Sequence, residues 1–181
     1  MKKELRKENR KARTNNKKII QIRMVFWYND YMNNTERDFY QISLKFILKN
    51  DKGEVLLMKA QNKDTYAGFY DLPGGRINVD EFTIPLTEAV QREVREEVGD
   101  IQYDLNPKPV AVARHLIPAN ISKHKREVHV LYLLYEGIYK KGDIVISYEH
   151  LGYMWANLNK IKLDKYLKSG NLEGVKMYLN L

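Results

Sequence analysis

Three glutamates lie within five consecutive residues of the stretch REVREEVG, at positions 93, 96 and 97. In an α-helix of 3.6 residues per turn, positions i, i+3 and i+4 share one face, so the three carboxylates would lie side by side. A few carboxylates, together with substrate phosphates and water, are the usual ligands of Mg²⁺ in proteins. A solvated acidic face is the alternative, because like charges at this spacing cost only about 0.2–0.5 kcal/mol per pair.

The element that must hold these carboxylates is a helix predicted over residues 86–98 (LTEAVQREVREEV). Gly99 is expected to end this helix, Thr83 to cap its start and Pro85 to lie in its first turn. Apolar residues recur at every fourth position and form a separate stripe that should face a core. That stripe consists of Leu86, Val90, Val94 and Val98.

The rest of the chain mixes strands and helices without a regular alternation. Strands are predicted over 39–48, 54–59, 69–72, 109–117 and 127–139, and KKGD is predicted as a turn before the strand-like IVIS. One or two helices are expected within 163–181. This order favours an α+β fold, arranged as an α/β/α sandwich around a mixed sheet. The segment 24–38 is aromatic but irregular, and either a strand or a packed arm fits it.

Composition excludes several classes of protein. With 181 residues, 44% of them apolar, the chain is long enough for one domain with a sizeable core. There is no cysteine, so disulfides, thiolate metal sites and cysteine nucleophiles are excluded. No serine lies in a nucleophile-elbow motif, and the four histidines lack metal-ligand spacing. No apolar run approaches the roughly 20 residues that span a bilayer, so we expect a cytoplasmic protein with no membrane contact.

The net charge of +8 is concentrated at the N-terminus. Residues 1–23 carry ten Lys or Arg and two Glu, whereas the remaining 21 basic and 21 acidic residues cancel. We therefore divide the chain into a basic, flexible tail over 1–23 and a domain over 24–181. A solvated tail, an arm that contacts RNA or another polyanion, and a true start at Met24 all fit this pattern.

The segment LPGGRINVDE followed by REVREEVG resembles the Nudix box, whose pattern is G-x5-E-x7-R-E-U-x-E-E-x-G-U, with U an apolar residue. Gly75 and Glu81 match its first two fixed positions, and the run from Arg92 to Gly99 matches the helix positions. Ten residues instead of seven separate Glu81 from Arg92, and we place the extra three in the loop before the helix. Asp100 stands where the last apolar residue is expected.

The resemblance implies a role for each matching residue. Glu93 and Glu97 would be the principal ligands of Mg²⁺ or Mn²⁺, with Glu96 a further direct or water-mediated ligand and the Gly75 carbonyl an additional oxygen donor. Arg92 would pair with an acidic neighbour and orient the ligands, as outer-shell residues commonly do at metal sites.

The reaction implied by the resemblance is hydrolysis of a phosphoanhydride in a nucleoside diphosphate linked to a group X. One alternative is an RNA 5′-end pyrophosphohydrolase that uses the basic tail, and another is a Nudix-fold nucleotide-binding module without catalysis. The intact set of glutamates argues against the last. The sequence leaves the oligomeric state open, a homodimer included.

Substrate-binding residues are less well marked. Five aromatic residues can stack on a base, and core packing is the favoured interpretation for all of them except Tyr66, which falls in a predicted loop. These are Trp27, Tyr66, Phe69, Tyr70 and Trp155. We retain Tyr66, Phe69 and Arg76 as candidates for contacts with the substrate.

A general base is expected outside the helix, because the helix glutamates would be occupied by metal. Many members of the family carry this base in an E-H-x-E context that precedes a tryptophan. The stretch SYEHLGYMW resembles that context, with Glu149 and His150 retained and Gly152 in place of the second acid. Glu149 is therefore the candidate base, and an ordinary surface carboxylate is the alternative.

Overall fold

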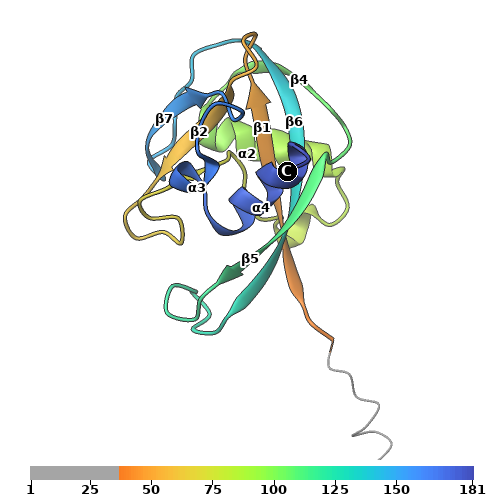
Figure 1. The fold of residues 1–181 in the computed structure, drawn as a ribbon. Helices are drawn as coiled ribbons and strands as arrows, with labels where there is room; N and C mark the ends of the chain where they lie inside the picture. Colours follow the sequence, from red (N-terminus) through yellow and green to blue (C-terminus); the bar gives the residue numbers. More distant parts are fainter. Residues whose placement is uncertain (1–36) are drawn as a thin grey trace, which may run out of the picture. The chain divides into compact units, whose positions relative to one another are not determined.

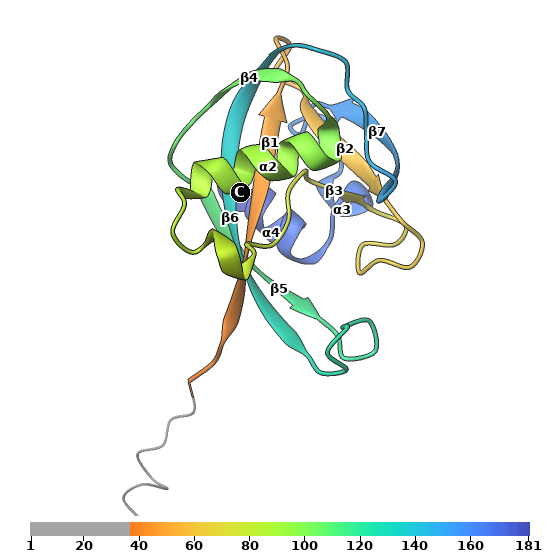
Figure 2. The same ribbon diagram turned by 180° about the vertical axis from the view of Figure 1, so that it is seen from behind.

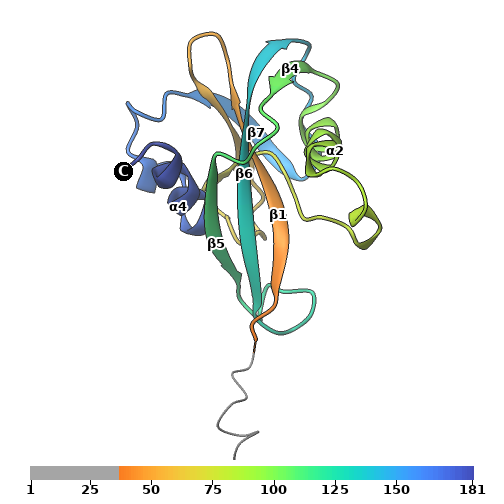
Figure 3. The same ribbon diagram turned by 90° about the vertical axis from the view of Figure 1, so that its right-hand side faces the viewer.

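Alternating side chains along strand β1 (Tyr40–Lys49) divide the fold into two sides. Successive side chains of a strand point to opposite faces of the sheet. Phe46 belongs to the core under helix α2 (Leu86–Val98), whereas Ile47 belongs to the core under helix α4 (Ser169–Tyr178). Figure 3 shows the sheet edge-on, with α2 on one side and α4 on the other. The predicted α/β/α sandwich is confirmed.

The structure, a computed structural model, describes residues 37–181. The predicted tail over 1–23, Trp27 and most of the segment 24–38 lie outside the described residues. Within the described part, Phe39–Leu181 forms one compact unit.

The sheet has seven strands in the order β3-β2-β1-β6-β4, with β5 also paired to β6 and β7 to β2 (Figures 1 and 2). β6 runs parallel to β1 and every other pair is antiparallel, so the sheet is mixed as expected. The other strands are β2 (Val55–Ala60), β3 (Tyr70–Asp71), β4 (Gln102–Leu105), β5 (Ala111–Ile117), β6 (Val128–Lys141) and β7 (His150–Ala156).

A gap in the pairing of β1 and β2 makes room for the glycine turn that follows β3. The two strands pair next to their hairpin turn and then diverge. The segment 73–77 lies along β1 instead: the N–H of Leu44 donates to the Gly75 carbonyl (2.8 Å) and the N–H of Phe46 to the Pro73 carbonyl (2.8 Å). The glycines therefore lie in the middle of the sheet rather than at its edge.

Helix α2 has the bounds that the sequence predicts, but its start differs. Pro85 is the N-cap residue, and Thr83 makes no cap. Leu86 is 38% exposed, because it precedes the part of the helix that lies over the sheet, and Ala89 is buried beside the valines instead. The stripe prediction is thus right for the three valines and wrong for Leu86.

The chain that follows β6 also differs from the prediction. The stretch IVIS forms no strand; the N–H groups of Val145 and Ser147 donate to the carbonyls of Val98 (2.9 Å) and Glu97 (3.1 Å). The last carbonyls of a helix have no partner within it, so this segment satisfies two of them. Gly99 ends the helix at φ +98°, as expected.

Strands β4 and β7 were not predicted. β4 has only four residues, and β7 contains a glycine and begins within the stretch that resembles a catalytic loop. The C-terminal region forms two helices, α3 (Leu163–Tyr166) and α4, and a short 3-10 helix, η1 (Val79–Glu81), precedes α2. No helix among residues 37–181 is both long and apolar enough to cross a membrane.

The end of α4 is joined to the sheet by a polar cluster. Lys49 Nζ lies 2.8 Å from Glu136 Oε2 and 3.0 Å from the Tyr178 hydroxyl, which itself donates to Glu136 (2.9 Å). Both charged side chains are only 25% exposed. The hydrogen bond from Lys49 outweighs the effect of burial and holds the pKa of Glu136 below its ordinary value.

We expect Glu136→Gln to lower the free energy of unfolding by about 1 kcal/mol at pH 7. Because the folded-state pKa of Glu136 is depressed, its contribution is present above the ordinary glutamate pKa and is lost as the pH falls through the folded-state value. Urea unfolding of both proteins should therefore give a difference that is constant from pH 7 to about pH 5 and shrinks as the pH falls further to about pH 3. Asp104→Asn, which breaks the exposed Lys140–Asp104 pair, serves as the control and should change little. A Glu136→Gln effect that stayed constant with pH would contradict this role.

Candidate active site

Two glutamates of α2 are buried against the glycine turn. Glu93 is 7% exposed and Glu97 is 9% exposed. The N–H of Gly74 donates to Glu97 Oε2 at 2.7 Å. The Glu93 carboxylate lies so close to Gly75 that a Cβ added there would be 2.5 Å from Oε2. Glycine is needed at this position because any side chain would displace the carboxylate.

Arg92 connects three of the acidic side chains. Its guanidinium holds Glu81 through two contacts, Nε–Oε1 at 2.5 Å and Nη2–Oε2 at 3.0 Å, and reaches Glu93 Oε1 at 2.8 Å and Glu96 Oε2 at 2.9 Å. These hydrogen bonds hold the pKa of Glu81 below its ordinary value and raise that of Arg92. The longer loop before α2 therefore still brings Glu81 to Arg92.

The carboxylates are balanced by protein groups. Burial raises the pKa of Glu93 despite the opposing charge of Arg92. Glu96 is 57% exposed at its side chain and lies at the outer edge of the group. Among residues 37–181, no three acidic or histidine side chains surround a common point in a metal-binding arrangement. Carboxylate oxygens beside a bare glycine backbone are nevertheless the type of donor that suits a hard divalent cation.

A buried lysine that the sequence did not mark as functional donates hydrogen bonds to the glycine turn and to the residues before it. Lys45 Nζ donates to Asp71 Oδ1 (2.8 Å), the Leu72 carbonyl (3.2 Å) and the Gly74 carbonyl (3.1 Å). Burial alone would lower the pKa of Lys45, but the charges of Asp71 and Glu97 outweigh it and the pKa is raised. Lys45 is therefore a cation at neutral pH.

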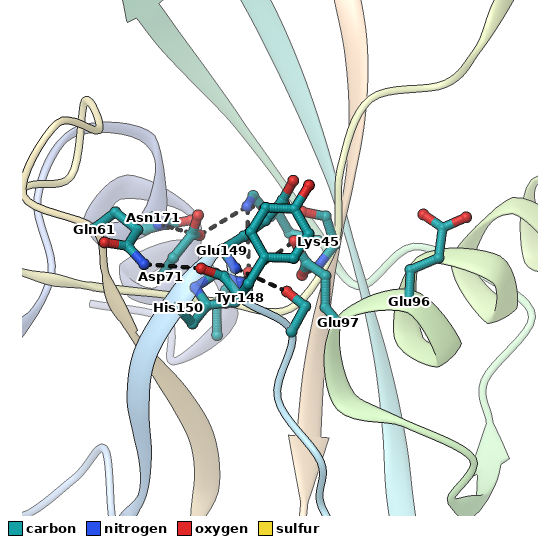
Figure 4. A network of polar contacts seen from close by, with 12 residues as sticks. Lys45, Gln61, Asp71, Glu96, Glu97, Tyr148, Glu149, His150 and Asn171 are labelled. Atoms are coloured by element: carbon teal, nitrogen blue, oxygen red, sulfur yellow. Dashed lines mark hydrogen bonds and ion pairs between the residues drawn. The ribbon is translucent and has the colours of Figure 1, made fainter.

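Helix α4 completes this network. Asn171, fully buried, donates from Nδ2 to Asp71 Oδ1 at 2.7 Å. Figure 4 shows Asn171, Asp71 and Lys45 in one line that leads towards Glu97. The one feature of the sequence that could have indicated this network is the lysine at the centre of the apolar strand ISLKFIL, because a lysine at such a position is buried only with a partner. Its partners lie 26 or more residues away along the chain.

The candidate base Glu149 is exposed and lies at the rim of the cleft. Its loop is held by Gln61, whose Nε2 donates to the Tyr148 carbonyl at 2.9 Å. The side chain of the next residue, His150, is 5% exposed, and its Nε2 lies 3.4 Å from Glu97 Oε1. The loop is thus held close to the helix glutamates.

Of the three predicted substrate-binding residues, Tyr66 and Arg76 line the cleft and Phe69 does not. Tyr66 is 2% exposed because its loop folds inward, so its ring is not free to stack on a base. Phe69 packs under Lys168 Nζ, 4.8 Å from the ring centre, and does not line the cleft. Arg76 is exposed in the cleft and donates from Nη1 to Gln41 Oε1 at 3.0 Å.

The cleft has a volume of about 470 Å³ and joins two chemically different ends. One end carries Arg92 and the three helix glutamates. The other is formed by the loop after β2 and by β5 and β6, and its walls are Tyr66, His115, Ile117, Val130 and Tyr132. A phosphorylated substrate can therefore place its phosphates at the first end and an organic group at the second.

Most of the chain is similar to a known protein family. The NUDIX domain family model matches residues 40–177. The chain is 27% identical over 119 residues to proteins named nucleoside triphosphatase NudI from Salmonella paratyphi B and Salmonella typhimurium. This match covers 65% of the present chain and 82% of each relative.

Solved structures share the fold. The MutT protein from Methanosarcina mazei Go1 superposes with a TM-score of 0.61 at 29% identity, covering 81% of this chain and 95% of that one. The Escherichia coli dihydroneopterin triphosphate pyrophosphohydrolase superposes with a TM-score of 0.56 at 16% identity, covering 80% of this chain and all of the other. The second likeness shows the fold alone.

The buried ion pair behind the glycine turn predicts a large effect on stability. Lys45→Met would leave Asp71 buried without its cation, which should lower the free energy of unfolding by about 3–5 kcal/mol. Adding Asp71→Leu to that variant should recover part of the loss. Lys59→Met, a matched change of a half-buried lysine on β2 that donates to the Gly68 carbonyl, should have a much smaller effect. Equal urea midpoints for Lys45→Met and Lys59→Met would contradict the assigned role.

Proposed function

Because this chain belongs to the Nudix family of phosphoanhydride hydrolases, we propose that it cleaves a nucleoside diphosphate linked to a further group X. The observation that carries the proposal is the pair of buried carboxylates, Glu93 and Glu97, set against the Gly74–Gly75 turn at one end of a polar cleft. Nucleoside triphosphates are the first substrates to test, since the Salmonella relatives are named nucleoside triphosphatases.

A divalent cation, Mg²⁺ or Mn²⁺, would be held by Glu93 and Glu97, with Glu96 as a direct or water-mediated ligand. The Gly75 carbonyl already accepts one backbone hydrogen bond and has a second lone pair for the cation. When bound, the cation supplies charge neutralisation at the bridging oxygens and lowers the pKa of a coordinated water.

The remaining residues position the ligands and the substrate. Arg92 orients Glu93 and Glu96 while Glu81 anchors its guanidinium. Lys45 donates to the Gly74 carbonyl while the N–H of Gly74 donates to Glu97, so the turn is held at both of its peptide groups. Arg76, which is exposed in the cleft, contacts the substrate phosphates. Preorganised charges of this kind need no rearrangement during the reaction.

Glu149 would accept the proton of the attacking water. It borders the same cleft as the helix glutamates, and its carboxylate is free of the ion pairs that engage Glu93 and Glu96. A base must come within about 2.6–3.2 Å of the water, and closure of a loop over the substrate can supply this contact.

The proposal is tested with a panel of nucleoside triphosphates, dinucleoside polyphosphates, nucleotide sugars, ADP-ribose and triphosphorylated RNA, each with Mg²⁺ and with Mn²⁺. Turnover of at least one nucleotide, abolished by a chelator, is expected. An absence of turnover across the panel with either cation would overturn the proposal. The tail over residues 1–23 stays a prediction, and loss of RNA binding on its removal would support an RNA substrate.

For the ligand glutamates, Glu93→Gln and Glu97→Gln should each lower kcat by several orders of magnitude. The amide keeps the side-chain volume but removes the charge that binds the cation. Glu96→Gln should cost less, because its carboxylate is exposed. Glu88→Gln, an exposed change in the first turn of the same helix, should leave kcat and the melting temperature unchanged. Near-full turnover by Glu97→Gln at saturating Mg²⁺ would remove Glu97 from the ligand set.

For the base, Glu149→Gln should lower kcat by roughly 10²–10⁴-fold and remove the acidic limb of the pH–rate profile. The side chain is exposed, so the melting temperature should not change. A loss below about threefold with an unchanged pH profile would instead assign the proton transfer to one of the helix glutamates.

A further inference from the structure

The end of the cleft away from the glutamates contains a cluster of hydroxyl groups around one histidine, which we call the His115 cluster. The Tyr66 hydroxyl lies 3.2 Å from His115 Nδ1 and 3.0 Å from the Tyr132 hydroxyl. The Ser169 hydroxyl lies 2.9 Å from the same Nδ1. Both tyrosine rings stack on the imidazole, with ring centres 5.0 and 5.4 Å away. One nitrogen of His115 is therefore fully engaged within the protein.

The other nitrogen of His115 is not engaged. Nε2 is buried and has no hydrogen-bond partner among the described residues. His115 is 7% exposed and lines the cleft. Buried polar groups are nearly always paired, and a buried one without a partner costs free energy. In a substrate cleft, the missing partner is best supplied by the substrate.

The two hydroxyls beside Nδ1 favour the tautomer of His115 that carries its proton on Nε2. The Tyr132 hydroxyl can donate to the Tyr66 oxygen, which leaves the Tyr66 proton free to be donated to Nδ1. Two hydroxyls, those of Tyr66 and Ser169, approach Nδ1, and each can donate to its lone pair. Burial, together with the positive charge of Lys45, lowers the pKa of His115 to about 4, so the ring is neutral at pH 7. A neutral ring that accepts at Nδ1 is a donor at Nε2.

The imidazole is held in place from the side of α4. Ser169 adopts φ +50°, a conformation that residues other than glycine rarely adopt and that persists where the surroundings enforce it. Gly170 packs so closely that a Cβ there would lie 2.9 Å from His115 Cβ and from the Tyr132 ring. The first turn of α4 thus fixes the imidazole ring of a residue that lines the cleft.

We propose that His115 is a specificity-determining residue that donates its Nε2–H to an acceptor atom of the substrate's nucleobase, either a carbonyl oxygen or an unprotonated ring nitrogen. This inference rests on the proposed function, because it assumes that the phosphates occupy the glutamate end. Ile117 and Val130 supply apolar walls beside His115, which suits a flat ring with a polar edge. Because Nε2 exposes almost no surface, the groups that cover it must shift as the base enters.

Two substitutions of His115 distinguish the role of Nε2 from that of Nδ1. His115→Gln places an amide N–H near the position of Nε2, whereas His115→Asn reaches only as far as Nδ1. The kcat/KM of each variant is measured on a nucleoside triphosphate that the wild type hydrolyses and on ribose 5-triphosphate, which has no base. We expect His115→Asn to lose about 10- to 100-fold on the nucleotide and nothing on ribose 5-triphosphate. His115→Gln should stay within about threefold of the wild type on both.

Several outcomes would overturn the proposal. Equal losses on the nucleotide and on ribose 5-triphosphate would indicate a purely structural role for His115. Wild-type kcat/KM in His115→Asn would show that the base does not use Nε2, and a buried water would then be its partner. Thermal melting of both variants checks that they fold.

A second measurement does not depend on turnover. The imidazole ¹⁵N resonances of the wild type report which nitrogen of His115 carries the proton, and they are followed while guanosine or uridine 5′-monophosphate is added. We expect a protonated Nε2 whose resonance shifts with at least one nucleotide and not with ribose 5-phosphate. A proton on Nδ1, or equal shifts with ribose 5-phosphate, would overturn the proposal. If the wild type hydrolyses no nucleotide, the proposed function fails, whereas this titration still tests His115.

Discussion

The close approach of bare backbone to two carboxylates, Gly74 to Glu97 and Gly75 to Glu93, is the constraint on which the rest of the site depends. A backbone N–H can meet a buried carboxylate at 2.7 Å here because no side chain intervenes. The approach also requires the turn to lie inside the sheet, which the divergence of β1 from β2 allows. The valines of α2 pack on the sheet and so place the glutamates against that turn.

Burying this much charge is costly, and the fold offsets the cost with two cations on opposite sides. Arg92 balances the glutamates from the solvent side of α2, and Lys45 balances Asp71 and Glu97 from beneath the turn. An isolated buried charge is strongly destabilising, so each partner requires the other. Asn171 extends the network to α4, the helix that also positions His115. Helix α4 thus contacts both the network beside Glu97 and the histidine at the far end of the cleft.

Sequence patterns predicted the parts of this arrangement that depend on local spacing. The period of α2, the glutamates on one face and the glycines before them are all read within 26 residues, and the structure brings them together. Patterns did not reveal the Lys45–Asp71–Asn171 network or the neighbour of Glu97, His150, because these contacts join residues distant in the chain. The burial of Tyr66 could not be predicted for a related reason: Tyr66 lies in a loop, but its partners on β5 and β6 hold the ring inside. The short strand β4 is too polar to be recognised without its neighbour in the sheet.

The central claim is that the contact between the Gly75 backbone and the Glu93 carboxylate positions Glu93 to bind a cation. One substitution tests this claim most directly. Gly75, unlike Gly74, has no positive φ, so alanine is compatible with its backbone and changes only the space that the carboxylate occupies. Calorimetric titration of Mn²⁺ into the wild type and Gly75→Ala should show affinity weakened by about 10- to 100-fold in the variant, with little change in melting temperature. Equal Mn²⁺ affinity in the two proteins would contradict the account.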